Sequence, residues 1–233
     1  MGDGQITVGE VDLRSPVSTG GMSARTTGGD VTNGRQGAAV SKADERRLNI
    51  VNRSALLFDR KGADQVSMSD IAEDVGLAKP SLYHYFSSKD EILNSIHVNT
   101  IEFLLDGIRR RRATDASPDV VLRGVLGDIF SLMETHPGHI RVFFESARRL
   151  PPDLLEPVRK REREYDQLVL ETIEQAIEDG YFRAVNSRSA AFAFFGMANW
   201  AAHWYRPGGT KRAEQFAEEF FDLFLNGVTA RRR

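Results

Sequence analysis

Side chains of four chemical types stand close together in residues 79–84. Lys79 is a cation, Pro80 a small apolar surface, Tyr83 a phenol and His84 an imidazole. Proline is accepted in the first turn of a helix, because its missing N–H would have no partner there. Such side chains near the N-terminal end of a helix are suited to the base edges of the major groove. The chemistry indicated is recognition of double-stranded DNA.

Residues suited to phosphate groups flank this stretch. Ser67 and Ser69 stand at the start of the preceding predicted helix, and Lys89 lies just beyond Phe86. Hydroxyl groups, helix N-termini and lysines are common partners of backbone phosphates. We therefore expect these residues to hold the chain against DNA.

Three predicted helices would position these side chains. Apolar spacing indicates one helix from about Ala43 to Arg60, a second from Met68 to Gly76, and a third that runs to about Phe86. A short helix pair joined at a glycine has the dimensions of a helix-turn-helix. A plain packing unit of two short helices is the alternative.

Residues 43–93 also resemble the DNA-binding domain of the TetR family of transcriptional regulators. The segments that carry the resemblance are Ser67–Ala72, Gly76, Ser81–Phe86 and Ser88–Leu93. The resemblance implies an all-helical homodimer that binds an operator and releases it when a small molecule binds the C-terminal domain. Position by position, it assigns base contacts to Lys79, Pro80, Tyr83 and His84 and phosphate contacts to Ser67, Ser69, Ser81 and Lys89.

The remaining chain has helical periodicity and no alternating pattern of useful length, so the fold class predicted is all-α. Residues 1–40 contain nine glycines and no aromatic residue, which predicts a disordered arm. Residues 41–90 would form the helix-turn-helix domain, and residues 91–233 a helical domain for effector binding and dimerisation.

Residues 190–205 are apolar nearly all round, and the last predicted helix carries more apolar surface than one neighbour should absorb, at Phe216, Phe220, Phe221 and Phe224. Helices of this kind must be covered on more than one side. We expect these two helices to pair with those of a second copy in a four-helix interface. An interior helix pair in a monomer is the alternative.

Asn199 and His203 are four residues apart and share one helix face. Two polar groups on an apolar face favour a ligand pocket, although each could be a satisfied core residue. The segments Phe143–Leu150, Gly180–Arg183 and Asn199–Gly209 are similar to TetR-type repressors of fatty-acid and steroid breakdown.

That second resemblance implies an acyl-coenzyme A thioester as effector. The acyl chain would lie among Phe143, Phe144, Trp200 and Trp204, and an arginine such as Arg148 would meet the phosphates. An aromatic stripe that serves only as core is the alternative.

Composition limits the other classes of function. The chain has no cysteine, which excludes thiol chemistry and favours a cytoplasmic protein. No apolar run is long enough to span a membrane, and no enzyme motif is recognisable. We expect no cofactor and no metal site, since His136 and His139 lack a third ligand. An all-helical enzyme or an interaction module without DNA binding is the alternative function.

Charge does not mark the chain as a DNA-binding protein. The net charge is −2, and residues 41–90 carry eight basic and eight acidic residues. Affinity for DNA would depend on where Lys79 and Lys89 lie and on pairing two subunits. The arginine run at residues 109–112 would be a solvated helix end.

Overall fold

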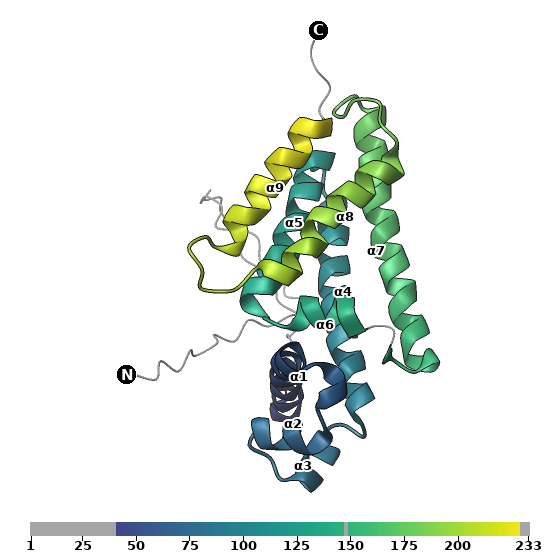
Figure 1. Cartoon of the computed structure of the whole chain (residues 1–233). Helices are drawn as coiled ribbons and strands as arrows, with labels where there is room; N and C mark the ends of the chain where they lie inside the picture. Colours follow the sequence, from purple (N-terminus) through teal and green to yellow (C-terminus); the bar gives the residue numbers. More distant parts are fainter. Residues whose placement is uncertain (1–40, 147–148, 229–233) are drawn as a thin grey trace, which may run out of the picture.

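A computed structural model describes residues 41–146 and 149–228 (Figure 1). This part of the chain consists of α-helices and short 3-10 turns and contains no β-strand, which confirms the all-α prediction. The predicted arm, residues 1–40, lies outside the described residues. The helices are α1 (Lys42–Lys61), η1 (Ala63–Gln65), α2 (Met68–Asp74), α3 (Lys79–Tyr83), α4 (Lys89–Arg112), α5 (Pro118–Thr135), α6 (His139–Ser146), α7 (Pro152–Glu178), α8 (Ser187–Trp204) and α9 (Ala213–Val228).

The first helix, α1, begins where a serine caps it. The Ser41 hydroxyl accepts a hydrogen bond from the Asp44 N–H at 3.1 Å, which satisfies one of the free amides of the first turn. The helix buries a face that includes Val51, Ala55 and Phe58. This face covers the two short helices that follow.

The helices α2 and α3 form the predicted helix-turn-helix. Ser67 and Asp70 make a reciprocal capping box at the start of α2. Gly76 adopts a φ of 68°, a left-handed conformation that favours glycine, and reverses the chain. Leu82 is fully buried and plugs the core that α1, α2 and α3 share.

The second of these helices is shorter than its spacing predicts. We expected a helix to about Phe86, but α3 ends at Tyr83. The N–H groups of His84 and Tyr85 bond the carbonyls of Ser81 and Leu82, three residues back, so the chain tightens into a turn. Phe86 still folds back and is buried.

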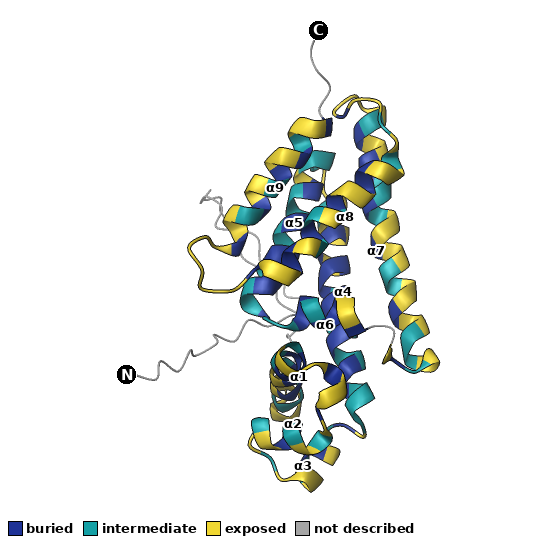
Figure 2. Cartoon of the chain, in the orientation of Figure 1, coloured by how far each residue is buried: buried dark blue, intermediate teal, exposed yellow. Residues whose placement is uncertain are grey.

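The long helix α4 joins two cores (Figure 1). Its first turns place Ile92 and Ile96 in the N-terminal core, and its later turns place Leu104 and Ile108 in the C-terminal core. Figure 2 shows buried positions along its whole length. A movement of α4 would therefore displace residues in both cores.

The arginine run at the end of α4 is not simply a solvated helix end, so that expectation is wrong for Arg111. Its guanidinium makes two hydrogen bonds to the Asp128 carboxylate of α5, at 2.6 and 2.7 Å. Arg109 pairs with Glu164 on α7. The partners of these arginines lie on other helices, so the local sequence pattern does not reveal them.

Candidate nucleic-acid interface and effector region

The predicted base-reading residues lie together on the exposed side of α3. Lys79, Pro80, Tyr83 and His84 are all exposed, and the Tyr83 side chain is 47% accessible. Leu82 is buried on the opposite side. The helix thus presents one face to solvent while the other anchors it.

The predicted phosphate contacts have different surroundings. Ser69 is exposed and Ser81 half-buried. The Ser67 hydroxyl donates to the Asp70 carboxylate at 2.5 Å, and this bond lowers the pKa of Asp70. The Lys89 ammonium donates to the Ala63 carbonyl at 2.7 Å, which leaves it two further protons for a phosphate. Of the four residues, Ser67 and Ser69 stand at the start of α2, Ser81 is in the first turn of α3, and Lys89 is the first residue of α4.

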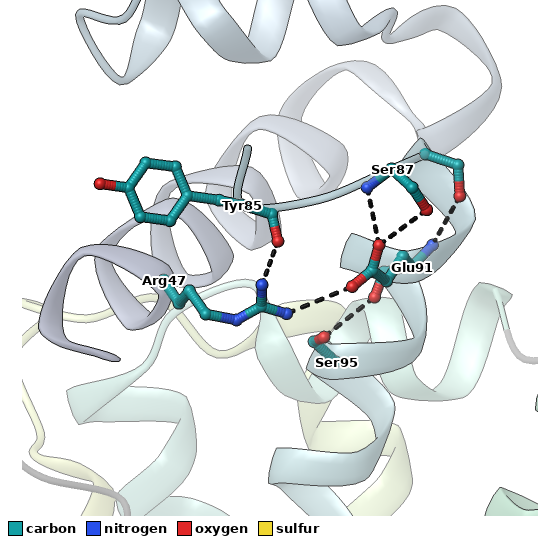
Figure 3. Close-up of polar contacts among 6 residues, drawn as sticks. Arg47, Tyr85, Ser87, Glu91 and Ser95 are labelled. Atoms are coloured by element: carbon teal, nitrogen blue, oxygen red, sulfur yellow. Dashed lines mark hydrogen bonds and ion pairs between the residues drawn. The ribbon is translucent and has the colours of Figure 1, made fainter. Parts of the chain in front are cut away.

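A polar network holds the end of α3 in place (Figure 3). Arg47 of α1 donates to the Tyr85 carbonyl and, at 3.2 Å, to the Glu91 carboxylate of α4. The second Glu91 oxygen accepts from the N–H and the hydroxyl of Ser87, at 2.7 and 2.9 Å. The Arg47 guanidinium also lies 4.2 Å from the centre of the Phe86 ring. Arg47 thereby fixes three parts of the chain relative to one another, namely α1, α4 and the segment that follows α3.

The charge of Glu91 is maintained by this network. Partial burial works against the charged form, but the hydrogen bonds from Ser87 and Arg47 lower the pKa of Glu91 overall. The role of Arg47 is not visible in the sequence, because its partners lie 38 and 44 residues away along the chain.

Most basic residues of the N-terminal domain are engaged within the protein. Arg46 donates to the Val75 carbonyl, Arg53 and Arg60 pair with Asp74, and Lys89 bonds Ala63. Lys79, by contrast, has no ion pair or hydrogen bond from its ammonium group within residues 41–146 and 149–228. It is an exposed cation placed for an external anion.

The predicted effector residues fall into separate environments. Phe143 is buried beside the His97 imidazole, with 5.3 Å between ring centres, whereas Phe144 is partly exposed. Arg148 lies outside the described residues. Burial lowers the pKa of His97 to about 4, so the ring that Phe143 contacts is neutral at pH 7.

The effector residues of α8 lie near or on the outer surface. Asn199 is half-buried and His203 exposed, while Trp200 is 65% exposed and lies 4.9 Å from the His203 ring. His203 Nδ1 is 3.9 Å from a carboxylate oxygen of Glu145 on α6. Trp204 packs on Phe216 of α9, at 5.0 Å between ring centres. The single subunit therefore brings His203 near the end of α6 but does not enclose Trp200.

Helix α6 connects the N-terminal domain to α8. His139 Nε2 is 3.0 Å from Asn52 Oδ1 on α1, and Arg141 contacts both Asp59 on α1 and the Ala202 carbonyl on α8. At Gly138 a side chain would come within 2.7 Å of an α1 carbonyl, so the two backbones approach closely. This junction can pass a displacement of α8 to α1.

The described residues contain no group of three histidine, aspartate or glutamate side chains able to hold a metal ion. His136 and His139 instead contact each other edge to face, at 5.5 Å between ring centres. Within the described part of the chain, no helix is both long and apolar enough to cross a membrane.

Two family matches cover most of the described chain. Residues 50–96 match the bacterial regulatory proteins of the tetR family, and residues 115–228 match the tetracyclin repressor-like C-terminal domain. The chain belongs to the TetR family of transcriptional regulators. It is a DNA-binding regulator and not an enzyme, as the sequence predicted.

Individual relatives agree with this assignment. The transcriptional repressor KstR2 of Mycobacterium tuberculosis H37Rv is 26% identical over 192 residues, which cover 82% of this chain and 96% of the relative. The solved structure of that ketosteroid transcriptional regulator has a TM-score of 0.76 and covers 80% of this chain and 96% of its own. PfmR from Thermus thermophilus is 28% identical with a TM-score of 0.71, over 78% of this chain and 99% of its own.

Proposed function

We propose that this regulator is a repressor that binds a near-palindromic operator as a homodimer and is released by a small-molecule effector. The observation that carries the proposal is the exposed face of α3, with Lys79, Tyr83 and His84 in solvent beside a buried Leu82. Relatives that span nearly the whole described chain are named as repressors. A protein of this kind would act in the cytoplasm, where operator DNA is found.

Each subunit would place α3 in the major groove. Lys79, Pro80, Tyr83 and His84 would contact bases, and Ser67, Ser69, Ser81 and Lys89 would contact phosphates. Two subunits would meet half-sites about one helical turn or more apart. Arg47 would support this contact indirectly, since it holds the end of α3 against α4.

The outer face of α8 and α9 supports a homodimer. Phe192 is 76% exposed, Trp200 65% and Leu223 67%, although all three are large apolar side chains. Ala193 and Gly196 lie exposed between Phe192 and Trp200, and small residues let helices approach closely. Large apolar side chains exposed in this number are typical of an interaction site. A second copy with the same face would bury it by two-fold symmetry.

The proposed effector is an acyl-coenzyme A thioester. Support comes from the similarity to KstR2, a ketosteroid regulator, and from the aromatic residues near α6 and α8. The residues proposed to meet it remain Phe143, Phe144, Arg148, Asn199, Trp200, His203 and Trp204. Because Trp200 and His203 are exposed in one subunit, their part of the site would be closed by the partner or by the ligand itself.

Effector binding would act by shifting a conformational equilibrium. The ligand would favour a state in which the two α3 helices no longer match the spacing of the half-sites. The routes available are α4, which spans both cores, and α6, which contacts both α1 and α8. The shift cannot exceed the preference of the ligand for one state over the other.

A gel-shift titration tests this function directly. The protein should retard DNA from upstream of its own coding region at low salt, and a long-chain acyl-coenzyme A should reverse the shift. Failure of the ligand-free protein to bind that DNA would contradict the repressor, whereas binding without reversal would contradict only the effector class.

A further inference from the structure

The exposed face of α3 carries a narrow set of chemical groups. Its exposed residues, together with the residue that precedes the helix, are Ala78, Lys79, Pro80, Tyr83 and His84. Residues 78–87 contain no arginine, asparagine, glutamine, aspartate or glutamate. Asparagine and glutamine are the usual partners of adenine in the major groove, and aspartate and glutamate accept from cytosine. This face, which we call the α3 face, therefore lacks the side chains that select adenine or cytosine directly.

The ammonium group of Lys79 is the one full positive charge in residues 78–87. It has no ion pair or hydrogen bond within residues 41–146 and 149–228, so all of its donors are available to DNA. An ammonium group donates and cannot accept, and it therefore needs a base edge that presents acceptors. Guanine presents two neighbouring acceptors in the major groove, N7 and O6, whereas the N7 of adenine stands beside an amino donor. Lys79 is thus suited to guanine.

Pro80 and Tyr83 supply apolar surface beside this charge. They are three residues apart and so lie on the same side of the helix. Pro80 is exposed, and Tyr83 is 47% exposed. Thymine carries the apolar group of the major groove, its 5-methyl group, and apolar side chains contact it. Pro80 and Tyr83 together are thus suited to thymine.

The other polar groups of the α3 face select no base by their chemistry. A neutral imidazole, as at His84, donates from one ring nitrogen and accepts at the other, and the Tyr83 hydroxyl also does both. Each group can therefore bond a donor or an acceptor on a base edge. Selective chemistry on this face is confined to the Lys79 charge and to the apolar surface of Pro80 and Tyr83.

The spacing of these residues limits the distance between the two bases. Lys79 and Tyr83 are four residues apart, which is about 6 Å along a helix axis. Successive base pairs are about 3.4 Å apart, so this distance spans about two steps of the duplex. Pro80 is adjacent to Lys79 and lies between them. The guanine and the thymine would therefore be separated by no more than about two base pairs.

Contacts behind the α3 face hold it in one position. Leu82 and Phe86 are buried, and Arg47 donates to the Tyr85 carbonyl. The ring of Pro80 fixes the backbone angle φ in the first turn. A side chain on a rigid element discriminates between bases better than one on a mobile segment, because it cannot move to a neighbouring base.

We infer that each operator half-site presents a guanine to Lys79 and, within about two base pairs, a thymine whose methyl group packs against Pro80 and Tyr83. The inference rests on the proposed function, because it assigns the bases that the proposed major-groove contact recognises. Adenine and cytosine are then selected only as the partners of thymine and guanine. The Lys79 charge also lies between the phosphates of the two strands, so it still contributes to the salt dependence of binding.

Selection of binding sites from random duplex DNA, with the full-length protein, tests the guanine. Wild-type protein should enrich guanine at one position of each half-site, and Lys79→Met should accept any base there and bind at least about fivefold more weakly. Lys89→Met, at a proposed phosphate contact, should weaken binding to all sequences by one factor and keep the guanine. Lys160→Met, at an exposed lysine of α7, is the control and should change neither affinity nor preference.

Modified bases in the selected operator test single chemical groups. At the enriched guanine, 7-deazaguanine removes only N7 and should weaken wild-type binding about three- to tenfold. Inosine removes only the minor-groove amino group and should leave the affinity unchanged. Uracil in place of the thymine removes only the methyl group and should weaken binding about fourfold per half-site. The loss from uracil should disappear in Tyr83→Ala, and the loss from 7-deazaguanine in Lys79→Met.

Two results would overturn the inference. One is a base preference that is the same in Lys79→Met and in wild-type protein, and the other is unchanged affinity when uracil replaces each thymine of the half-site in turn. If wild-type protein still prefers the selected operator to random DNA, either result overturns the base assignment alone. If wild-type protein prefers no sequence, the proposed repressor is overturned as well.

Discussion

The Arg141 guanidinium lies 3.1 Å from the Asp59 carboxylate, and this pair joins α6 to α1 across the boundary between the two cores. Both side chains are about one-fifth exposed, so solvent screens the pair only in part. Arg141 also donates to the Ala202 carbonyl of α8, at 3.1 Å. A displacement of α8 would therefore disturb the residue that joins α6 to α1.

Arg141→Met should uncouple effector binding from DNA release. The variant keeps an apolar side chain but loses both polar contacts. Substitutions at such junctions alter the coupling free energy between two binding sites by about 0.5–2 kcal/mol. We expect operator and effector each to bind with near-normal affinity when tested alone, while a higher effector concentration is needed for release in a gel shift. Arg163→Met, which removes a pair confined to the surface of α7, is the control. Unaltered release by Arg141→Met would show that the contacts of Arg141 are not needed to transmit the signal.

Tyr83→Ala should weaken operator binding without harming the fold. Tyr83 is 47% exposed on α3, and loss of a base contact costs about 1–3 kcal/mol, or about a 5- to 150-fold change in affinity. Fluorescence anisotropy with labelled operator would measure the change, and Tyr181→Ala provides an exposed tyrosine far from α3 in the chain as control. Full-strength binding by Tyr83→Ala would remove that residue from the interface.

Operator affinity should depend only weakly on salt. Each neutralised phosphate contributes a slope of about −0.9 to log K against log salt, so Lys79 and Lys89 from two subunits predict a slope of about −4. The arginines of residues 41–90 are held within the protein, by backbone carbonyls and by the carboxylates of Asp74 and Glu91. Anisotropy between about 50 and 300 mM salt measures the slope. A slope of about −8 would mean that the ion pairs within the protein open and that their arginines contact DNA phosphates.

Trp200→Glu should convert the dimer into monomers. A charge in place of the exposed Trp200 side chain would stay unpaired when a second copy covers it, and the burial of an unpaired charge is costly. Light scattering with size-exclusion chromatography gives the mass. Val120→Glu places the same charge on an exposed apolar residue of α5 and should remain dimeric. A dimeric Trp200→Glu protein would place the interface elsewhere.

Stability should fall as the pH is lowered from about 6.5. Burial, together with the neighbouring His136, lowers the pKa of His139 to about 3, and burial lowers that of His97 to about 4. Below the ordinary histidine pKa, the unfolded chain binds a proton at each of these two residues and the folded chain does not. A lower pH therefore favours the unfolded chain, and the stability has its full value above about pH 6.5. Between about pH 6.5 and the folded pKa, each contributes a loss of up to about 1.4 kcal/mol per pH unit.

Urea unfolding at pH 7, 6 and 5 would measure this loss. His139→Gln should reduce the steepness of the decline, because one buried site no longer takes up a proton on unfolding. An equal decline in wild type and His139→Gln would show that this histidine is protonated in the folded protein.

The sequence by itself determined the features that depend on near neighbours. Helix starts follow from serines three residues before a free amide, as at Ser41, Ser67 and Ser88. The turn between α2 and α3 follows from Gly76, and the buried side of α3 from the position of Leu82. These are interactions within one or two helical turns, and a linear pattern records them.

Only the tertiary structure decided which distant residues meet. Arg47 reaches Tyr85 and Glu91, Arg111 reaches Asp128, and Arg141 reaches Asp59, across 17 to 82 residues of chain. Each of these arginines is indistinguishable from a surface residue in the sequence, because its partner is set by how the helices pack. The same reason explains why the exposure of Trp200 was not foreseen: burial is a property of the assembled helices and not of the residue type.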